Sequence, residues 1–272
     1  MPVGPQDPSR GVLDFPRALQ AFRLDRRPPR PDLAPWVESY WEVEWDLPAG
    51  TVHRQTNLSH AAFNAAVEGD GAWIYGVPGP TFVRELSGTG RVFGVKFHPG
   101  AFFPWLKQPL GAFFDLRVGL TETLGAPWAS WVREVAAEQD FGRRAELTDG
   151  FWGARQPGLP GEGRRCVKTM VEERTLVRVE DACRVLGHDT RSLQRLFHRE
   201  VGAPPKDVLR RYRLMEAAER LVKEPHLTGA DLAATLGYTD QAHFIRDFKA
   251  VTGVPPEAYR RRQELSTSPI RR

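Results

Sequence analysis

The alternation of apolar and polar residues divides the chain into a strand-rich half and a helical half. Residues 41–47, WEVEWDL, alternate between apolar and acidic side chains, which is the pattern of a half-buried strand. Four short apolar segments follow, separated by the turn-forming clusters EGDG, PGP and SGTG, at 61–67, 72–77, 81–87 and 91–97. Short strands at this spacing predict a small antiparallel barrel or sandwich.

After about residue 120 the apolar spacing is that of helices. One predicted helix has apolar residues at i, i+3, i+4 and i+7, namely Trp128, Trp131, Val132 and Val135. This stripe suits either packing on the barrel or contact with a second copy of the chain. A second helix is predicted over 143–154. Beyond Arg164 apolar positions recur every three or four residues, which predicts a helical second half.

A repeated unit lies in this helical half. The segment SLQRLFHREVGAPP at 192–205 aligns without a gap with HFIRDFKAVTGVPP at 243–256. Each copy follows a short helical segment that ends at a glycine suited to a left-handed turn, Gly187 in the first and Gly237 in the second. Two short helices joined in this way form a helix-turn-helix, so the sequence predicts two such units in tandem.

The stretch between the two units predicts how far apart they lie. Residues from Lys206 to Lys223 favour one helix about 27 Å long, at 1.5 Å per residue. Such a rod can hold two recognition helices about one turn of B-DNA apart, near 34 Å. We therefore expect one monomer to enter two successive major grooves on one face of the duplex and to bind an asymmetric site.

Charge and composition support two halves with different roles. The 272 residues suffice for two domains, and 41% hydrophobic with 26% charged residues is typical of a globular protein. Residues 1–160 carry 16 Lys and Arg against 18 Asp and Glu, a net charge of −2. Residues 161–272 carry 22 against 16, a net charge of +6. A basic half suits a nucleic-acid partner.

The expected organisation is an α+β chain of two domains. Residues 1–156 are assigned to a β-rich regulatory or sensor domain, a cupin-like β-barrel followed by flanking helices after about residue 120. The segment 157–163, PGLPGEG, is the predicted linker, and residues 164–265 form an all-α tandem helix-turn-helix domain. No apolar run approaches the roughly 18 residues of a membrane-spanning helix, and the N-terminus lacks a secretory signal, so we expect a cytoplasmic protein without membrane contact.

Three motifs of the repeated region carry a family resemblance, SLQRLF at 192–197, GYTD at 237–240 and GVPPEAYR at 253–260. Through them residues 164–262 resemble the DNA-binding domain of the AraC/XylS family of bacterial transcription regulators. The resemblance implies binding to double-stranded DNA, with RNA polymerase as a partner if the protein is an activator. It also implies the base-contacting residues, which are Arg191, Gln194, Arg195, Gln241, Ala242, His243, Ile245 and Arg246.

Side-chain chemistry supports part of this set. Arginine can fork onto guanine O6 and N7, and glutamine onto adenine N6 and N7, whereas Ala242 and Ile245 offer only apolar contact, for example to thymine methyl groups. The alternative interpretation of these residues is a solvated helix face. Basic residues around the recognition helices are predicted to contact phosphates, which position the protein without reading sequence. They are His198, Lys206, Arg210, Arg211, Lys249 and Arg260.

The first half resembles, more loosely, the β-rich regulatory domains fused to such DNA-binding domains. The shared features are Tyr-Trp at 40–41 and FGVKFHPG at 93–100. The resemblance implies a place for a small-molecule effector without identifying it, and Arg84 and Lys96 are candidates to hold an anionic one. The aromatic candidates equally suit the core of a small barrel. The predicted effector pocket consists of Trp41, Trp45, Trp73, Arg84, Phe93 and Phe97.

An enzymatic role is not favoured. The histidines of the first half, His53, His60 and His98, lack the close pair with a neighbouring carboxylate that holds iron or zinc in small barrels. Both cysteines, Cys166 and Cys183, lie in the second half, which excludes an alkyl-accepting thiolate in the first. We therefore expect no enzyme activity, no cofactor and no metal.

The expected function is that of a sequence-specific transcription regulator, activator or repressor. Its tandem units bind DNA, and its N-terminal domain senses a small molecule or mediates association, for example as a homodimer. Two alternatives stay open. The first is a nonspecific architectural DNA-binding protein with an inert N-terminal domain, and the second is a cupin-like metalloenzyme tethered to DNA.

Overall fold

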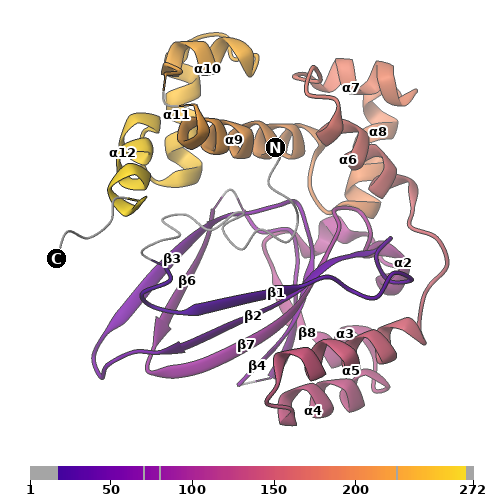
Figure 1. Ribbon diagram of the computed structural model, residues 1–272. Coiled ribbons are helices and arrows are strands. Elements are labelled where there is room, and N and C mark those ends of the chain that lie inside the picture. Colours follow the sequence, from indigo (N-terminus) through magenta and orange to yellow (C-terminus); the bar gives the residue numbers. More distant parts are fainter. Residues whose placement is uncertain (1–17, 70, 80, 225, 268–272) are drawn as a thin grey trace.

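The computed structural model describes residues 18–69, 71–79, 81–224 and 226–267 and consists of a β-rich part and a helical part (Figure 1). The β-rich part holds a six-stranded antiparallel sheet, in the order β1-β2-β7-β4-β5-β8, and a separate two-stranded sheet of β3 and β6. The strands are β1 (Arg23–Arg27), β2 (Val37–Asp46), β3 (Val52–Leu58), β4 (Asn64–Glu68), β5 (Gly71–Tyr75), β6 (Thr81–Ser87), β7 (Thr89–Phe97) and β8 (Arg117–Gly119).

Helices complete the first half and build the second. The first half contains α2 (Phe103–Leu106), the 3-10 helix η1 (Leu110–Phe113), α3 (Leu120–Leu124), α4 (Trp128–Ala137) and α5 (Phe141–Gly153). The second contains α6 (Glu162–Glu172), α7 (Val179–Leu186), α8 (Thr190–Glu200), α9 (Pro205–Lys223), α10 (Gly229–Thr235), α11 (Gln241–Thr252) and α12 (Pro256–Thr267). Within the described ranges, no helix has the length and apolar character needed to cross a membrane.

The structure confirms a β-rich first part and a helical second part, and the described strands do not form a closed barrel. The alternating segment at 41–47 lies in β2, between β1 and β7. Among the described strands, no hydrogen-bonded ladder joins β3 and β6 to the six-stranded sheet, so the two sheets form an open sandwich. The cupin-like description of this fold stays a prediction. Strands β1 and β3 were missed because their polar sequences, RLDRR and VHRQTNL, contain no apolar run.

The apolar stripe predicted at 128–135 packs inside the chain. Trp131 and Val135 of α4 are each 1% exposed, and the Trp131 ring meets Trp152 of α5 at 5.6 Å. Trp152 in turn contacts Phe97 of β7, with ring centroids 5.1 Å apart. The stripe therefore holds α4 and α5 against the sheet, which decides between the two predicted roles in favour of packing.

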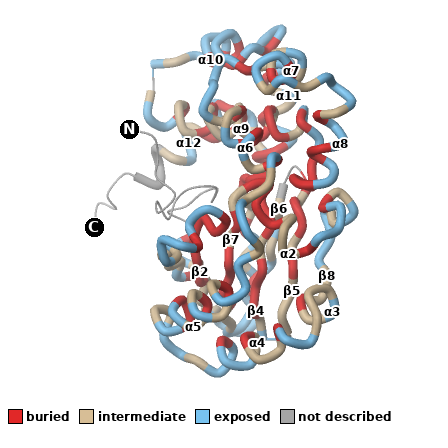
Figure 2. Tube along the Cα trace, turned by 90° about the vertical axis from the view of Figure 1, so that its right-hand side faces the viewer, coloured by how far each residue is buried: buried red, intermediate tan, exposed pale blue. Residues whose placement is uncertain are grey.

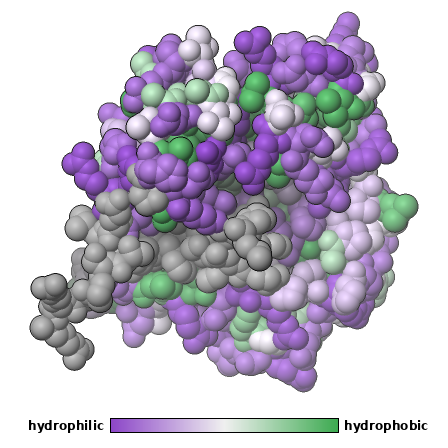
Figure 3. Space-filling model, turned by 45° about the horizontal axis from the view of Figure 1, so that its top comes forward, coloured by the Kyte–Doolittle hydropathy of each residue, from purple (hydrophilic) through white to green (hydrophobic). Residues whose placement is uncertain are grey.

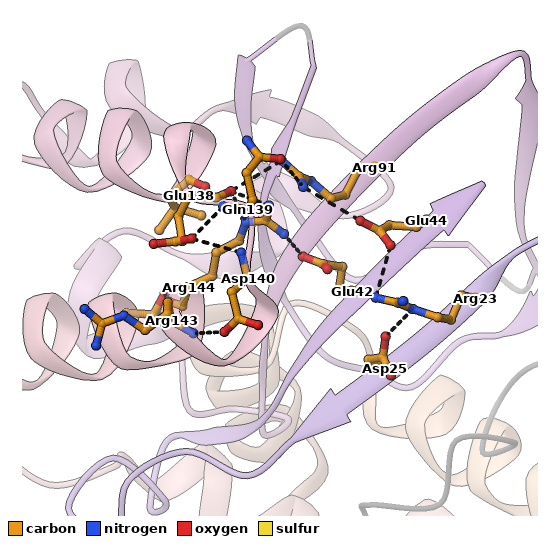
Figure 4. A network of polar contacts seen from close by, with 12 residues as sticks. Arg23, Asp25, Glu42, Glu44, Arg91, Glu138, Gln139, Asp140, Arg143 and Arg144 are labelled. Carbon is orange, nitrogen blue, oxygen red and sulfur yellow. Dashed lines mark hydrogen bonds and ion pairs between the residues drawn. The ribbon is translucent and has the colours of Figure 1, made fainter. Parts of the chain in front are cut away.

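A buried ion pair ties the same helices to β2 (Figure 4). The Arg144 guanidinium of α5 pairs with the Glu42 carboxylate, and the two side chains are 1% and 2% exposed. Arg144 also donates hydrogen bonds from Nε to the carbonyls of Val135 and Glu138 and from Nη2 to the Glu138 carbonyl. Burial raises the pKa of Glu42, although Arg144 opposes this rise. Two residues along the strand, Glu44 forms ion pairs at a more exposed site.

One hydrophobic core runs from the sheet into the first helix-turn-helix unit. It includes Phe63 and Leu110 from the first half and Phe197 and Val201 from the second. Buried segments, red in Figure 2, occur both in the strands and in the helices above them. Gly202, at φ +86°, lies against Phe63 and Leu110, where a β-carbon would come within 2.8 Å of the Phe63 ring. The two halves therefore share one hydrophobic core, and the exact division at 156 and 164 stays a prediction.

Replacing Glu42 by alanine should lower the free energy of unfolding by about 3–5 kcal/mol, because it leaves the buried Arg144 charge unpaired. Chemical denaturation followed by tryptophan fluorescence measures this loss. The matched control is Glu44→Ala on the same strand, which should cost less than about 1 kcal/mol because its ion pairs are partly exposed. Equal losses for the two variants would contradict the role assigned to the buried pair.

Candidate nucleic-acid interface and ligand cavity

Both recognition helices begin at a capped end just after a left-handed glycine. In the first unit, Gly187 (φ 71°) follows α7, and the Asp189 carboxylate accepts a 2.8 Å hydrogen bond from the backbone at the start of α8. In the second, Gly237 (φ 70°) follows α10, and Asp240 accepts a 2.7 Å hydrogen bond from the His243 N–H at the start of α11. Such aspartates satisfy N–H groups that have no partner within the helix. The two predicted helix-turn-helix units are confirmed.

The first recognition helix, α8, has one buried and one exposed face. Leu193 and Phe197 are fully buried in the shared core. Arg191, Gln194 and Arg195 lie on the opposite face and are exposed. Their predicted base contacts therefore require no rearrangement of α8 itself.

The second recognition helix, α11, is similar but less polar. Phe244 and Phe248 are fully buried in the core of this unit, and Ile245 is half-buried against it. The remaining predicted base-contacting residues are exposed, namely Gln241, Ala242, His243 and Arg246. Contact of Ile245 with DNA would compete with its packing, so it is the weakest member of the predicted set.

The helix α9 separates the two units as the sequence predicts. It spans 19 residues, or about 28 Å. Figure 1 shows α7 and α8 at one end of this rod and α10 and α11 at the other, while Figure 3 shows a mostly hydrophilic surface over these helices. Two exposed polar helix faces thus lie at the ends of a rod whose length is comparable to one turn of B-DNA.

The predicted phosphate-contacting residues divide by environment. Lys206 and Lys249 are exposed, and so is His198, although its ring lies against Gly111 of η1. Arg210 forms a bidentate pair with Asp247 of α11, with hydrogen bonds of 2.9 and 3.0 Å. The side chains of Arg211 and Arg260 are directed inward.

Arg260 and Arg211, two of the predicted phosphate-contacting residues, have inward-directed side chains. The Arg260 guanidinium donates to the Leu227 carbonyl and pairs with Glu257, and only 14% of its side chain is exposed. Arg211 is 6% exposed and donates to carbonyls of the first half. Burial lowers its pKa from the ordinary arginine value. Arg211 is thus an interdomain residue in this structure, and its phosphate contact stays a prediction.

A cavity of about 370 Å³ lies between the six-stranded sheet and the sheet of β3 and β6. This volume is within the range of small-molecule sites. Strand alternation determines its wall, because every second side chain of β2 enters it, from Ser39 through Trp41 and Val43 to Trp45. From β6, Arg84 and Leu86 close the opposite side.

Three of the six predicted pocket residues line this cavity, namely Trp41, Trp45 and Arg84. Phe93 and Phe97 do not, because they occupy the other face of β7 and are buried against the helices, each 2% exposed or less. Trp73 is also outside the cavity wall and lies under the Arg117 guanidinium, 3.7 Å from the ring centroid. The sequence identified the right strands but not which face of each strand forms the pocket.

Two glycines make room for the tryptophans of the cavity. Gly94 and Gly90 of β7 stand directly opposite Trp41 and Trp45 in the strand register. A β-carbon at either glycine would overlap the facing indole ring. The Trp41 Nε1–H donates to the Asn64 side chain, at 3.1 Å, which holds the ring flat over the sheet.

Charged groups gather at one end of the cavity. The Glu68 carboxylate accepts a hydrogen bond from Arg84 at 2.5 Å and another from the Tyr75 hydroxyl. Arg117 lies 3.8 Å from the same carboxylate. Burial raises the pKa of Tyr75, so its hydroxyl remains a donor. No local motif joins Glu68, Tyr75 and Arg117, which come from three separate strands, so their sequence gives no sign of this cluster.

Lys96 also faces the cavity, as its candidate role requires, and pairs with Glu38 at 2.9 Å.

Across the described part of the chain, no group of three or more His, Cys, Asp or Glu side chains is arranged to hold a metal ion. Cys166 and Cys183 are both buried, and burial raises the pKa of the Cys166 thiol to about 11. Neither cysteine lines the cavity.

Comparison with known families agrees with the two-part architecture. Residues 182–262 match the family model described as a helix-turn-helix domain, HTH_18. The C-terminal region is an AraC-type helix-turn-helix domain. Residues 25–119 match a domain of unknown function, DUF6597, which covers most of the described sheet.

Two curated relatives each match about a third of the chain. The HTH-type transcriptional activator AarP of Providencia stuartii is 34% identical over 82 residues, which are 30% of this chain and 60% of AarP. The putative HTH-type transcriptional regulator YkgA of Escherichia coli K12 is 33% identical over 86 residues, which are 32% of this chain and 36% of YkgA. The chain thus matches less than two thirds of the length of either relative.

Among solved structures, the chain is similar to a crystal structure of apo ToxT, as a single-residue variant, from Vibrio cholerae strain SCE256. The identity is 12%, the alignment covers 86% of this chain and 98% of that one, and the TM-score is 0.43. These values are too low to transfer any property of ToxT to this chain.

Replacing Gly94 by alanine should displace the Trp41 ring and lower the free energy of unfolding by about 1–3 kcal/mol, because the added methyl group overlaps the indole. Denaturant unfolding and the tryptophan emission spectrum measure both effects. The control is Gly69→Ala, where a β-carbon meets nothing within 4 Å and the backbone is not left-handed. If Gly94→Ala leaves stability and emission unchanged, Trp41 does not lie where the cavity requires it.

Proposed function

We propose that this protein is a sequence-specific DNA-binding transcription regulator, in which one monomer inserts α8 and α11 into successive major grooves. The observation that carries the proposal is the pair of capped recognition helices, each with an exposed polar face, at opposite ends of α9. The helix-turn-helix match at 182–262 supports it, as does the similarity of the chain to the HTH-type regulators AarP and YkgA. The two units lie between residues 164 and 265, after the proposed linker at 157–163.

We further propose that the cavity of the β-rich domain, within residues 1–156, binds a small-molecule effector. Its wall combines the indoles of Trp41 and Trp45 with the charged groups at its end. Four basic side chains face it, Arg26, Arg84, Lys96 and Arg117, against two acidic ones, Glu68 and Asp115, which is a surplus of two positive charges. This balance favours an anionic effector with an apolar body.

In this proposal the protein acts in the cytoplasm and catalyses no reaction. RNA polymerase is a further partner if the regulator is an activator. One monomer is sufficient to span both grooves, and a homodimer is an additional assembly that DNA binding does not require. A nonspecific architectural role is the competing function, and the following experiment separates the two.

Arg195→Ala should weaken binding to the preferred sequence by about 1–3 kcal/mol, or roughly 5- to 150-fold, and relax the preference at one base pair. The preferred duplex is first selected from a random-sequence pool with the full chain, and binding is then titrated by fluorescence anisotropy. The control is Arg143→Ala, an exposed arginine of α5 in the β-rich domain, which should have no effect. Equal weakening on all sequences would support the architectural alternative.

Binding should also weaken as salt rises, because phosphate contacts release counterions from the duplex. Lys206→Ala and Lys249→Ala, both at exposed positions, should reduce the slope of log affinity against log salt by about 1 each and leave the sequence preference unchanged. Titration at four or more salt concentrations gives this slope. An unchanged slope in both variants would exclude their predicted phosphate contacts.

A further inference from the structure

We propose that an occupant of the cavity acts on the second helix-turn-helix unit and leaves the first unit in place. This inference rests on the proposed function, because it takes the cavity as the effector site and the two units as the DNA-reading elements. It assigns the effector a specific action, which is to change the placement of α11 relative to α8.

The two units are attached to the β-rich domain in different ways. The buried residues of the first unit, among them Leu193 and Phe197, belong to the same hydrophobic core as the large sheet. The second unit has a core of its own, built around Phe244 and Phe248. Among the described residues of this second core, Leu58 is the one that comes from the β-rich domain.

Leu58 joins the cavity to the second unit. It is the last residue of β3, is 7% exposed and forms part of the cavity wall. The same side chain belongs to the core of the second unit, and α11 contacts both β3 and β6. A displacement of this strand end by a bound molecule is therefore passed directly to the second recognition helix.

The linking helix α9 rests on the rim of the same cavity. Arg211 donates hydrogen bonds to the carbonyls of Ser59, at 3.3 Å, and Pro78, at 2.6 Å. The next residue, Tyr212, packs edge-on against the ring of His60, with centroids 6.0 Å apart. Ser59, His60 and Pro78 all line the cavity.

These contacts lie where α9 passes from one core to the other. Before them, Val208 and Leu209 are buried in the core shared with the large sheet. After them, Leu214, Ala217 and later residues are buried in the core of the second unit. Arg211 and Tyr212 thus form a support at the middle of the rod, with the first unit anchored on one side of it and the second unit on the other.

The wall formed by β3 and β6 is the one that can respond to an occupant. The described strands contain no ladder between this two-stranded sheet and the large sheet, whose opposite face is packed against α4 and α5. Close-packed interiors transmit such a displacement to their neighbours because they contain little empty space. A ligand that binds one position of this wall more tightly shifts the population toward that position and, with it, toward one placement of α11.

The experiment compares hydrogen exchange in the two units of the full chain with and without a cavity occupant. The first occupant is 8-anilinonaphthalene-1-sulfonate, an aromatic anion whose fluorescence reports binding. The second occupant is the larger side chain introduced by Val43→Trp, which extends into the cavity from the large sheet. If Val43→Trp impairs folding, Val43→Phe repeats the test with a smaller ring. Both substitutions should also weaken binding of the dye at least fivefold, which locates the dye in the cavity.

We expect either occupant to change amide exchange at least threefold in residues 229–262 and less than twofold in residues 179–201. Leu58→Ala should still bind the dye. Its change in amide exchange over residues 229–262 should be less than a third of the change in the unmodified protein. Leu86→Ala is the matched control, because Leu86 also lines the cavity from this two-stranded sheet but packs with Phe22 and not with the second unit. It should preserve the response.

The inference is overturned if both units respond alike, if neither responds to dye or side chain, or if Leu58→Ala responds like the unmodified protein. Selecting DNA from the random-sequence pool with the same protein preparations tests the proposed function independently of the coupling. Sequence-specific binding without the unequal exchange response contradicts only the coupling through Leu58. Loss of any sequence preference in the unmodified protein contradicts the regulator function itself.

Discussion

The hydrophobic core shared by the large sheet and the first helix-turn-helix unit is the interaction on which the rest of the structure depends. Phe63 and Leu110 pack against Phe197 and Val201 across what the sequence presents as a domain boundary. Because α8 is held by this core, the start of α9 is held as well, and the direction of α9 then places the second unit above the end of β3. The DNA-reading half and the cavity are thus parts of one packed body.

Strand alternation explains how one sheet serves two purposes. In β2, Tyr40 and Glu42 point to the helices, whereas Trp41 and Trp45 point to the cavity. The first face is closed by aromatic packing and by the buried pair with Arg144. The second face stays partly open because its covering sheet is only two strands wide. A one-residue slip of β2 against its neighbours would exchange the two faces and destroy both the core and the cavity.

The basic residues show that environment, and not sequence position, decides what an arginine does. Arg191 and Arg195 extend from an exposed helix face and suit recognition of bases. Arg144 and Arg211 have the same chemistry but are buried, where they satisfy carboxylate and carbonyl oxygens within the protein. The net charge of the second half therefore does not by itself give the charge presented to DNA. Local pairing, as between Arg210 and Asp247, also occupies a guanidinium that could otherwise contact a phosphate.

The sequence by itself determined the features that depend on local periodicity: the strand over 41–47, the amphipathic helices, and the two units with their turn glycines. It also located Trp41 and Trp45 on a strand with clear alternation, and Arg84 on a short segment bounded by turn residues. It did not reveal β3, whose polar side chains give no apolar run, or the cluster of Glu68, Tyr75 and Arg117. Only the tertiary structure brought those three strands together, turned Phe93 and Phe97 away from the cavity and buried Arg211, because each of these outcomes depends on contacts between residues far apart in the chain.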